Sequence, residues 1–218
     1  MKRLPGLELL GLTADRSFIG GSFFLRGLEK ERRWFVRKIH KLCPEDARLL
    51  DIGCGGGFLL HSLSKVRQPS GLYGVDVNRS VIRVARKRVK ANFILASASS
   101  LPFRNETFDV MSMVDILHHV TNTRGAARDM LRALRKHGYV ILTEPAVCSK
   151  ITAVLAYIYT WVLGKMTRQP WAAVFLTPTE ISLLFPNVRN MFLREIFLKK
   201  VFYLKAARVF LIAEKSQT

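Results

Sequence analysis

Cysteines are few in this 218-residue chain, and no apolar run in it is long enough to span a membrane. Cys43, Cys54 and Cys148 lie far apart, form no CxxC pair and make no zinc set with the five histidines. This spacing argues against a disulfide framework and against a bound metal, so we expect a reducing, cytoplasmic compartment. The first residues resemble no signal peptide, and the uncharged run 151–164 is shorter than the roughly 20 residues that a spanning helix needs.

Acidic residues are also scarce, with 16 Asp and Glu against 35 Lys and Arg and a formal net charge of +19. A charge of this size favours anionic partners, which include nucleic acid, an acidic membrane surface or a phosphorylated substrate, and it does not choose among them. Residues 79–90 carry six basic residues and no acid, together with apolar residues at helical spacing. This segment is either the solvated face of an amphipathic helix or a surface that binds anions.

Glycines gather at one place, in the sequence LLDIGCGGGFLL at residues 49–60. The pattern predicts a strand, a tight loop and a helix. Gly53, Gly55 and Gly57 lack a Cβ, so a ligand can lie directly against their main chain. A dinucleotide fingerprint would place a third small residue at Phe58, and the Lys-Ser/Thr of a P-loop is absent. The loop therefore favours another nucleotide-type ligand.

The segment DIGCGGG at residues 51–57 resembles the first motif of class I, Rossmann-like methyltransferases that use S-adenosylmethionine. The resemblance extends over roughly residues 45–145 and is closest to the type 11-like branch that acts on small molecules and quinones. Further matching segments are GVDV at 74–77, LPF at 101–103, TFDV at 107–110, LHHV at 117–120 and LRKHGYVI at 134–141. The resemblance implies a methyltransferase that binds S-adenosylmethionine and releases S-adenosylhomocysteine.

Strand-like and helix-like segments alternate along the chain, which predicts an α/β fold with a mostly parallel sheet and helices on both faces. The resemblance implies seven strands, and we expect a terminal hairpin to complete them. We predict an N-terminal helical cap at 1–44 and a methyltransferase domain at 45–218 with a cap insertion near 146–178. The expected strands are 49–52, 71–77, 92–96, 108–114, 138–144, 191–198 and 207–213, and the expected helices 58–66, 80–89, 124–136 and 179–185.

Ligands of parallel α/β sheets bind beyond the carboxyl ends of the strands, so polar residues at these ends should surround one crevice. The resemblance implies that Asp51 and the glycine loop hold the methionine end of the cofactor. It also implies that Asp76 holds the ribose hydroxyls while Val77 covers the adenine. Ser97 stands where the family often has an acid. The candidate cofactor residues are Asp51, Gly53, Gly55, Gly57, Asp76, Val77, Ser97, Ala98 and Asp115.

Candidates for chemistry are His118, His119 and Glu144. Methyl transfer from a sulfonium mainly requires alignment, and a general base is needed only when the acceptor must lose a proton. Either histidine could be that base, and the sequence does not separate them. Glu144 is a candidate for contact with the acceptor.

The leading hypothesis is methyl transfer to a small, apolar or lipid-like acceptor. The aromatic-containing run 151–164 and the basic segments favour peripheral contact with an anionic membrane at its inner face. The runner-up is an RNA or protein methyltransferase, suggested by the net charge, although the Asn/Asp-Pro-Pro-Tyr signature of base-amino methyltransferases is missing. A third alternative is a noncatalytic S-adenosylmethionine-binding protein. The oligomeric state stays open.

Overall fold

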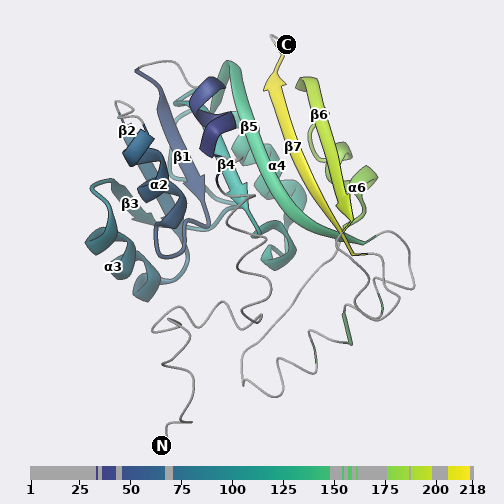
Figure 1. Cartoon of the computed structure of the whole chain (residues 1–218), viewed down its shortest axis with the longest axis horizontal. Helices are drawn as coiled ribbons and strands as arrows, with labels where there is room; N and C mark the ends of the chain where they lie inside the picture. The colour runs from purple at the N-terminus through teal and green to yellow at the C-terminus, as the bar shows by residue number, and fades with distance from the viewer. Residues whose placement is uncertain are drawn as a thin grey trace, which may run out of the picture.

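The fold was analysed in a computed structural model, which describes residues 33, 36–42, 46–66, 71–147, 154, 157, 158, 161, 176–186, 188–197 and 206–216. Seven strands form one sheet in the order β3-β2-β1-β4-β5-β7-β6. The strands are β1 (Arg48–Ile52), β2 (Gly71–Asp76), β3 (Asn92–Leu95), β4 (Phe108–Val114), β5 (Leu134–Val147), β6 (Val188–Phe197) and β7 (Ala206–Lys215). Figure 1 shows them side by side with the twist usual for such sheets.

The first five strands are parallel, and the last two close the sheet as the predicted antiparallel hairpin. This confirms the predicted fold class. The described helices are α2 (Phe58–Val66), α3 (Arg79–Arg88), α4 (Thr123–Ala133) and α6 (Pro178–Leu183), with a 3-10 turn η2 (Leu117–His119). Helices α2 and α3 return the chain from one parallel strand to the next, as crossover connections must.

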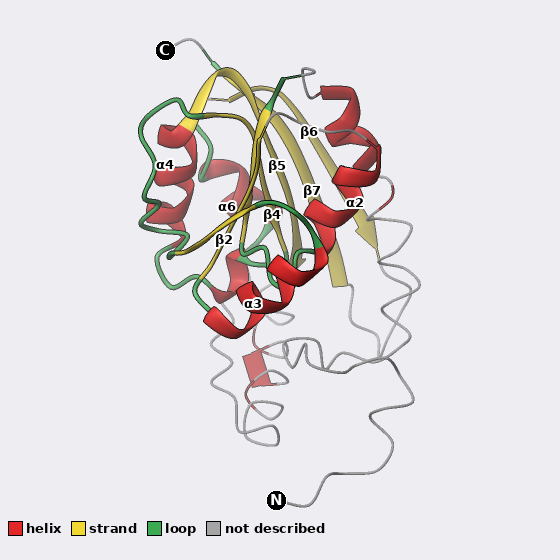
Figure 2. Ribbon diagram, turned by 90° about the vertical axis from the view of Figure 1, so that its left-hand side faces the viewer, coloured by secondary structure: helices red, strands yellow, loops and turns green. Residues whose placement is uncertain are grey.

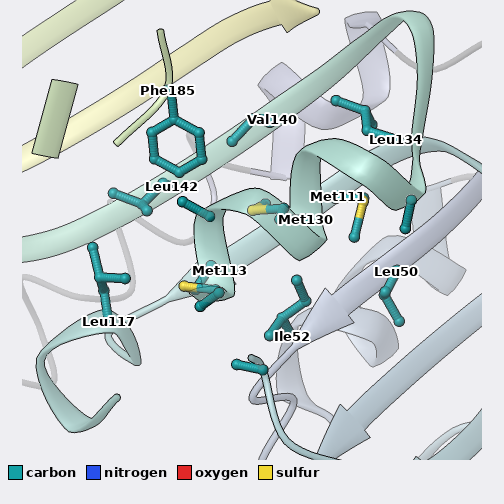
Figure 3. Packing of buried hydrophobic residues seen from close by; sticks show 14 of the residues in the cluster. Leu50, Ile52, Met111, Met113, Leu117, Met130, Leu134, Val140, Leu142 and Phe185 are labelled. Carbon is teal, nitrogen blue, oxygen red and sulfur yellow. The ribbon is translucent and has the colours of Figure 1, made fainter. Parts of the chain in front are cut away.

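Two apolar clusters cover the two faces of the sheet, and neighbouring strand residues alternate between them. Leu50 of β1 packs in the cluster beneath α4 and α6, whereas Leu49 packs in the cluster beneath α2 and α3. Figure 2 shows these helix pairs on opposite sides of the sheet, and Figure 3 shows side chains of the first cluster meeting around Met113 and Met130. Successive side chains of a strand point to opposite faces of the sheet, so each strand contributes side chains to both clusters.

The boundary between α4 and β5 differs from the predicted one, because the helix ends at Ala133 and not at Lys136. Leu134 is fully buried and extended and pairs with Phe108, and His137 adopts a φ of 60°. A side chain at Gly138 would lie 2.8 Å from the Asp109 carbonyl oxygen. Tertiary packing at this corner therefore overrides the helical propensity of LRK.

The predicted caps fall mostly outside the described residues. Residues 36–42 are helical, and Val36 and Ile39 are buried in the cluster beneath α2 and α3. Four residues of the run 151–164 are described as helical, and all of them are about half exposed: Val154, Tyr157, Ile158 and Trp161. The division into cap and domain stays a prediction.

Candidate functional site at the carboxyl edge of the sheet

The central strands end at the same level, which brings the predicted site residues to one edge of the sheet. Ile52 of β1 pairs with Val75 of β2 on one side and with Met113 of β4 on the other. The glycine loop, the β2–α3 turn and the β4–η2 turn therefore begin next to one another. In Figure 1 this is the end of the sheet toward which the arrowheads of β1 and β4 point.

Three glycines of the loop after β1 adopt positive φ angles, and each has different surroundings. At Gly53 (φ 68°) an added Cβ would lie 2.3 Å from the side chain of Ile116, so the missing side chain lets the β4–η2 turn pack against the loop. At Gly57 (φ 76°) an added Cβ would lie 3.0 Å from Ala85, so the missing side chain lets helix α3 pack against the loop. At Gly55 (φ 48°) it would meet nothing within 4 Å. Only Gly55 of the three faces open space.

Asp76 ends β2 beside this open space and ties the loop to the sheet. Its Oδ2 atom accepts a hydrogen bond from the Gly55 N–H at 3.0 Å, and its Oδ1 atom accepts one from the Asn78 N–H at 2.8 Å. Each carboxylate oxygen has two lone pairs, so each retains capacity for a further donor. Val77 follows with 70% of its surface exposed, which is high for an apolar residue. A carboxylate and an apolar surface thus stand side by side.

Asp51 lies beneath the loop and is only 3% exposed. The Ser112 hydroxyl on β4 donates a hydrogen bond of 2.9 Å to its Oδ1 atom. Burial raises the pKa of Asp51 to about 7, which the Ser112 bond opposes and the negative charge of Asp76 reinforces. A carboxylate kept at this cost in stability is a candidate for pairing with a cationic ligand group.

Ser97 and Ala98 follow β3 on the far side of Asp76. The Asp76 carbonyl accepts a hydrogen bond from the Ala96 N–H, which places the two turns next to each other. Ser97 is exposed, and its hydroxyl lies 3.1 Å from that of Ser99. Ala98 is buried in the core, so its side chain supports the turn.

The turn after β4 forms the second half of the site. Asp115 has a φ of 55°, and its N–H donates to the Thr143 carbonyl of β5. Glu144, the next residue of β5, is 1% exposed. Its Oε2 atom accepts from the Leu117 N–H at 3.0 Å, and its Oε1 atom accepts from the His118 N–H at 3.0 Å and contacts the His118 Nδ1 atom. Burial raises the pKa of Glu144, although His118 opposes the shift.

The two histidines, which the sequence could not separate, have different surroundings. His118 has a side chain that is 13% exposed and is paired with Glu144. The His119 side chain is exposed, and its ring centroid lies 3.9 Å from that of His118. Partial burial, and to a lesser extent the charge of His118, lowers the pKa of His119 to about 4. His119 is therefore neutral at physiological pH.

Three side chains that support the site were not among the predicted residues. Ser112 binds Asp51, and its signal was a polar residue inside the apolar strand VMSMV. Ile116 fills the space above Gly53. Arg88 donates to the Gly56 carbonyl, and its guanidinium lies 3.5 Å from the centre of the Phe58 ring. Sequence spacing gives no signal for the last two contacts.

Within the described part of the chain, no group of three or more His, Cys, Asp or Glu residues could hold a metal ion. Among the same residues, no helix has both the length and the apolar character needed to cross a bilayer.

Residues 50–142 match the profile of a family described as a methyltransferase domain. This central part of the chain resembles a methyltransferase domain. The match begins inside β1 and ends inside β5, so it includes the glycine loop, Asp76 and the His118 turn. This confirms the resemblance drawn from the motifs.

Similar sequences include a ubiquinone/menaquinone biosynthesis C-methyltransferase UbiE of Pseudomonas fluorescens, 31% identical over an alignment of 132 residues that covers 55% of this chain and 52% of that protein. A phthiotriol/phenolphthiotriol dimycocerosates methyltransferase of Mycobacterium ulcerans is 30% identical over an alignment of 100 residues that covers 44% of this chain and 37% of that protein. The chain spans about half, or less, of the length of these curated relatives.

Similar solved structures include the YcgJ protein of Bacillus subtilis, with a TM-score of 0.69, 16% identity and coverage of 87% of this chain and 100% of that one. A phosphoethanolamine N-methyltransferase of Haemonchus contortus, solved with phosphomonomethylethanolamine and S-adenosylhomocysteine, has a TM-score of 0.67 and 15% identity, covering 85% of this chain and 53% of that one. At these identities the likeness establishes the shared fold.

Proposed function

We propose that the protein is an S-adenosylmethionine-dependent methyltransferase that acts on a lipid-like, quinone-type acceptor. The observation that carries the proposal is the pairing of Gly55, which faces open space, with the carboxylate of Asp76 and the exposed Val77. A nucleoside needs these three features together: backbone that it can approach closely, acceptors for two ribose hydroxyls, and an apolar surface for its base.

The described residues fit S-adenosylmethionine at both of its ends. Asp76 and Val77 would hold the adenosine, and the buried carboxylate of Asp51 would attract the amino group of the methionine part. Ser97 and the Ala98 backbone would border the base, and Asp115 would border the methionine part. The bound cofactor supplies a methyl group on a positively charged sulfur. The protein's own task is then to align the acceptor and exclude water.

The acceptor class rests on the relatives. The names of the two curated relatives refer to ubiquinone and menaquinone biosynthesis and to dimycocerosates, which supports an apolar acceptor with a long lipid part. Isothermal titration calorimetry with S-adenosylmethionine and S-adenosylhomocysteine tests the cofactor. A methyl-transfer assay tests the acceptor by comparing a short-chain hydroquinone with RNA and a basic peptide as alternative acceptors. Absence of heat from a folded protein with both cofactor forms would overturn the proposal.

We further propose that the protein approaches its acceptor at an anionic bilayer. Helix α3 exposes Arg79, Arg83 and Lys87 and has no acidic residue, so it supplies long-range attraction of about 1 kcal/mol per basic residue near the surface. Apolar side chains that could insert into the bilayer recur at helical spacing and are 49–58% exposed: Val154, Tyr157, Ile158 and Trp161.

Flotation with vesicles of phosphatidylglycerol and phosphatidylcholine tests this second proposal. Binding should weaken as salt rises and as the fraction of acidic lipid falls, and the double variant Ile158→Ser and Trp161→Ser should bind the vesicles less. Leu183→Ser on α6 is the matched control, because Leu183 is also apolar and 74% exposed but lies outside the run. Tight binding of a labelled RNA without vesicle association would instead favour the RNA methyltransferase.

A further inference from the structure

The contact between His118 and Glu144 is a largely buried pair of a histidine and a carboxylate in the η2 half of the site. Glu144 reaches η2 from β5, the strand next to β4, and its side chain is 1% exposed. Each of its oxygens accepts one backbone N–H of the turn, from Leu117 and His118. Backbone N–H groups can only donate, so these two bonds orient the carboxylate with both oxygens as acceptors.

The ring of His118 is oriented by the same carboxylate. Its Nδ1 atom contacts Glu144 Oε1, the oxygen that also accepts the His118 N–H. A carboxylate held by three donors favours the tautomer in which Nδ1 carries the proton and Nε2 carries the lone pair. A proton added at Nε2 then makes a cation whose charge Glu144 balances directly.

We propose that His118 is the general base of the methyl transfer and that Glu144 is its positioning residue, for an acceptor whose phenol-type hydroxyl must lose a proton. This inference rests on the proposed methyltransferase function. His118 Nε2 takes the hydroxyl proton, and the electron pair of that O–H bond becomes the nucleophile that bonds to the methyl carbon. The electron pair of the broken carbon–sulfur bond stays on sulfur, and His118 afterwards releases the proton to water.

An acceptor that is already a free amine would need no such base, so the pair selects the chemical class of the acceptor. A phenolate can react through its oxygen or through the adjacent ring carbon. In the second case a ring π pair bonds to the methyl carbon, the ring C–H proton then leaves to water as its electron pair restores the aromatic ring, and the oxygen regains a proton. One proton is lost overall in both cases. Among the described residues, the ionisable groups near the His118–Glu144 pair include Asp115 in the turn before η2 and His119 on η2. His119, neutral at physiological pH, adds no competing positive charge.

A second histidine–carboxylate pair in the described structure provides a matched control. The His137 Nδ1 atom lies 2.9 Å from Glu214 Oε1, between β5 and β7, and the His137 side chain is 59% exposed. The pair has the same chemistry as His118 and Glu144 but lies at the start of β5, away from the carboxyl edge of the sheet. Solvent screens it, so it should contribute little.

The first test needs neither cofactor nor acceptor. Nitrogen NMR of histidine-labelled protein should show His118 with its proton on Nδ1, and Glu144→Gln should weaken that preference. The His118→Asn spectrum assigns the resonance. A His118 that carries its proton on Nε2 would overturn the proposal, even if the protein proves not to bind S-adenosylmethionine.

The second test measures turnover of a short-chain hydroquinone under reducing conditions, with cofactor affinity measured in parallel. His118→Asn should lower kcat about 100-fold or more, with S-adenosylhomocysteine affinity changed less than about 3-fold. Glu144→Gln should lower kcat and change the pH–rate profile, whereas a purely structural role would leave the profile unchanged. His137→Asn should leave kcat unchanged.

If His118→Asn kept wild-type kcat, the base assignment would be wrong. His118→Asn preserves Glu144 and its two backbone bonds, so it tests the base even if Glu144→Gln fails to fold.

Discussion

The glycine-loop half of the site and the η2 half differ in where their functional groups come from. In the glycine-loop half, the Asp76 carboxylate accepts the backbone N–H groups of Gly55 and Asn78, and the Ser112 side chain supports Asp51 beneath the loop. In the η2 half, the decisive contact joins the side chains of His118 and Glu144, which are 26 residues apart and meet through the pairing of β4 with β5.

The two halves therefore differ in how well the sequence alone predicts them. A loop built from glycine and backbone can be recognised from the sequence, because glycine adopts positive φ angles more readily than other residues. A pair of side chains on different strands depends on register, since a shift of one residue would turn Glu144 to the opposite face. We therefore expect variants of the first half to act on cofactor affinity and variants of the second half to act on turnover.

The largest effect is expected for Gly55→Val. The added side chain would occupy the open space beside Asp76, so affinity for S-adenosylmethionine should fall at least about 1,000-fold, or about 4 kcal/mol. The φ of 48° adds strain of about 1–2 kcal/mol, which a folded domain tolerates. Calorimetry and circular dichroism measure both quantities.

Gly57→Val is the matched control for that variant. Its side chain would collide with Ala85 of α3, so this change should mainly lower the free energy of unfolding. Normal cofactor binding by Gly55→Val would mean that the ligand does not lie on this loop.

The next effect concerns Asp51 and has opposite signs for stability and for binding. Its pKa of about 7 exceeds the ordinary value of 3.8, so between pH 4 and 7 the folded protein holds a proton that the unfolded chain releases. Stability therefore falls as pH rises through this window, by roughly 4 kcal/mol in full. Asp51→Asn should raise the free energy of unfolding at pH 8 by a few kcal/mol, measured with urea, and should weaken cofactor binding.

Asp129→Asn is the control with the reverse sign. Burial opposes the shift, but hydrogen bonds from Arg132 and the Leu101 N–H hold the pKa of Asp129 below its usual range. Loss of the Asp129 carboxylate should therefore lower the free energy of unfolding at pH 8. Equal pH dependence of unfolding in wild type and Asp51→Asn would show that Asp51 is ionised in the folded state without penalty.

A smaller effect is expected for Asp76→Ala, which should weaken S-adenosylmethionine and S-adenosylhomocysteine by about 1.5–3 kcal/mol through loss of charge-assisted hydrogen bonds. The variant also releases the N–H groups of Gly55 and Asn78. Asp76→Asn keeps one acceptor oxygen and should lose less. Calorimetry that finds unchanged affinity in a folded Asp76→Ala protein would remove Asp76 from the site.

The smallest effect is expected for His119→Asn. Because the pKa of His119 is lowered to about 4, the unfolded chain binds its proton more tightly, and stability falls as pH drops from about 6.5 to about 4. His119→Asn should reduce that loss, by no more than about 1 kcal/mol since the side chain is exposed. Thermal unfolding at pH 7 and pH 5 measures it. A steeper loss of stability at low pH in His119→Asn would contradict the lowered pKa of His119.

The sequence by itself determined the order of strands and helices and the position of the glycine loop. Period-two strands and glycine-rich turns are local patterns, and β4 and α2 have the predicted ends, Phe108–Val114 and Phe58–Val66. The end of α4 could not be predicted, because burial of Leu134 and the tight approach at Gly138 depend on β4.

Only the tertiary structure decided the roles within the site. It distinguished Gly55, which faces open space, from Gly53 and Gly57, which face Ile116 and Ala85. It also distinguished His118 from His119, because Glu144 reaches one ring and not the other. Glycine looks the same in a sequence whether a ligand or a side chain lies against it, and adjacent histidines look alike until a neighbouring strand supplies a carboxylate to one of them. What surrounds a residue is a property of the packed chain, and local sequence contains no record of it.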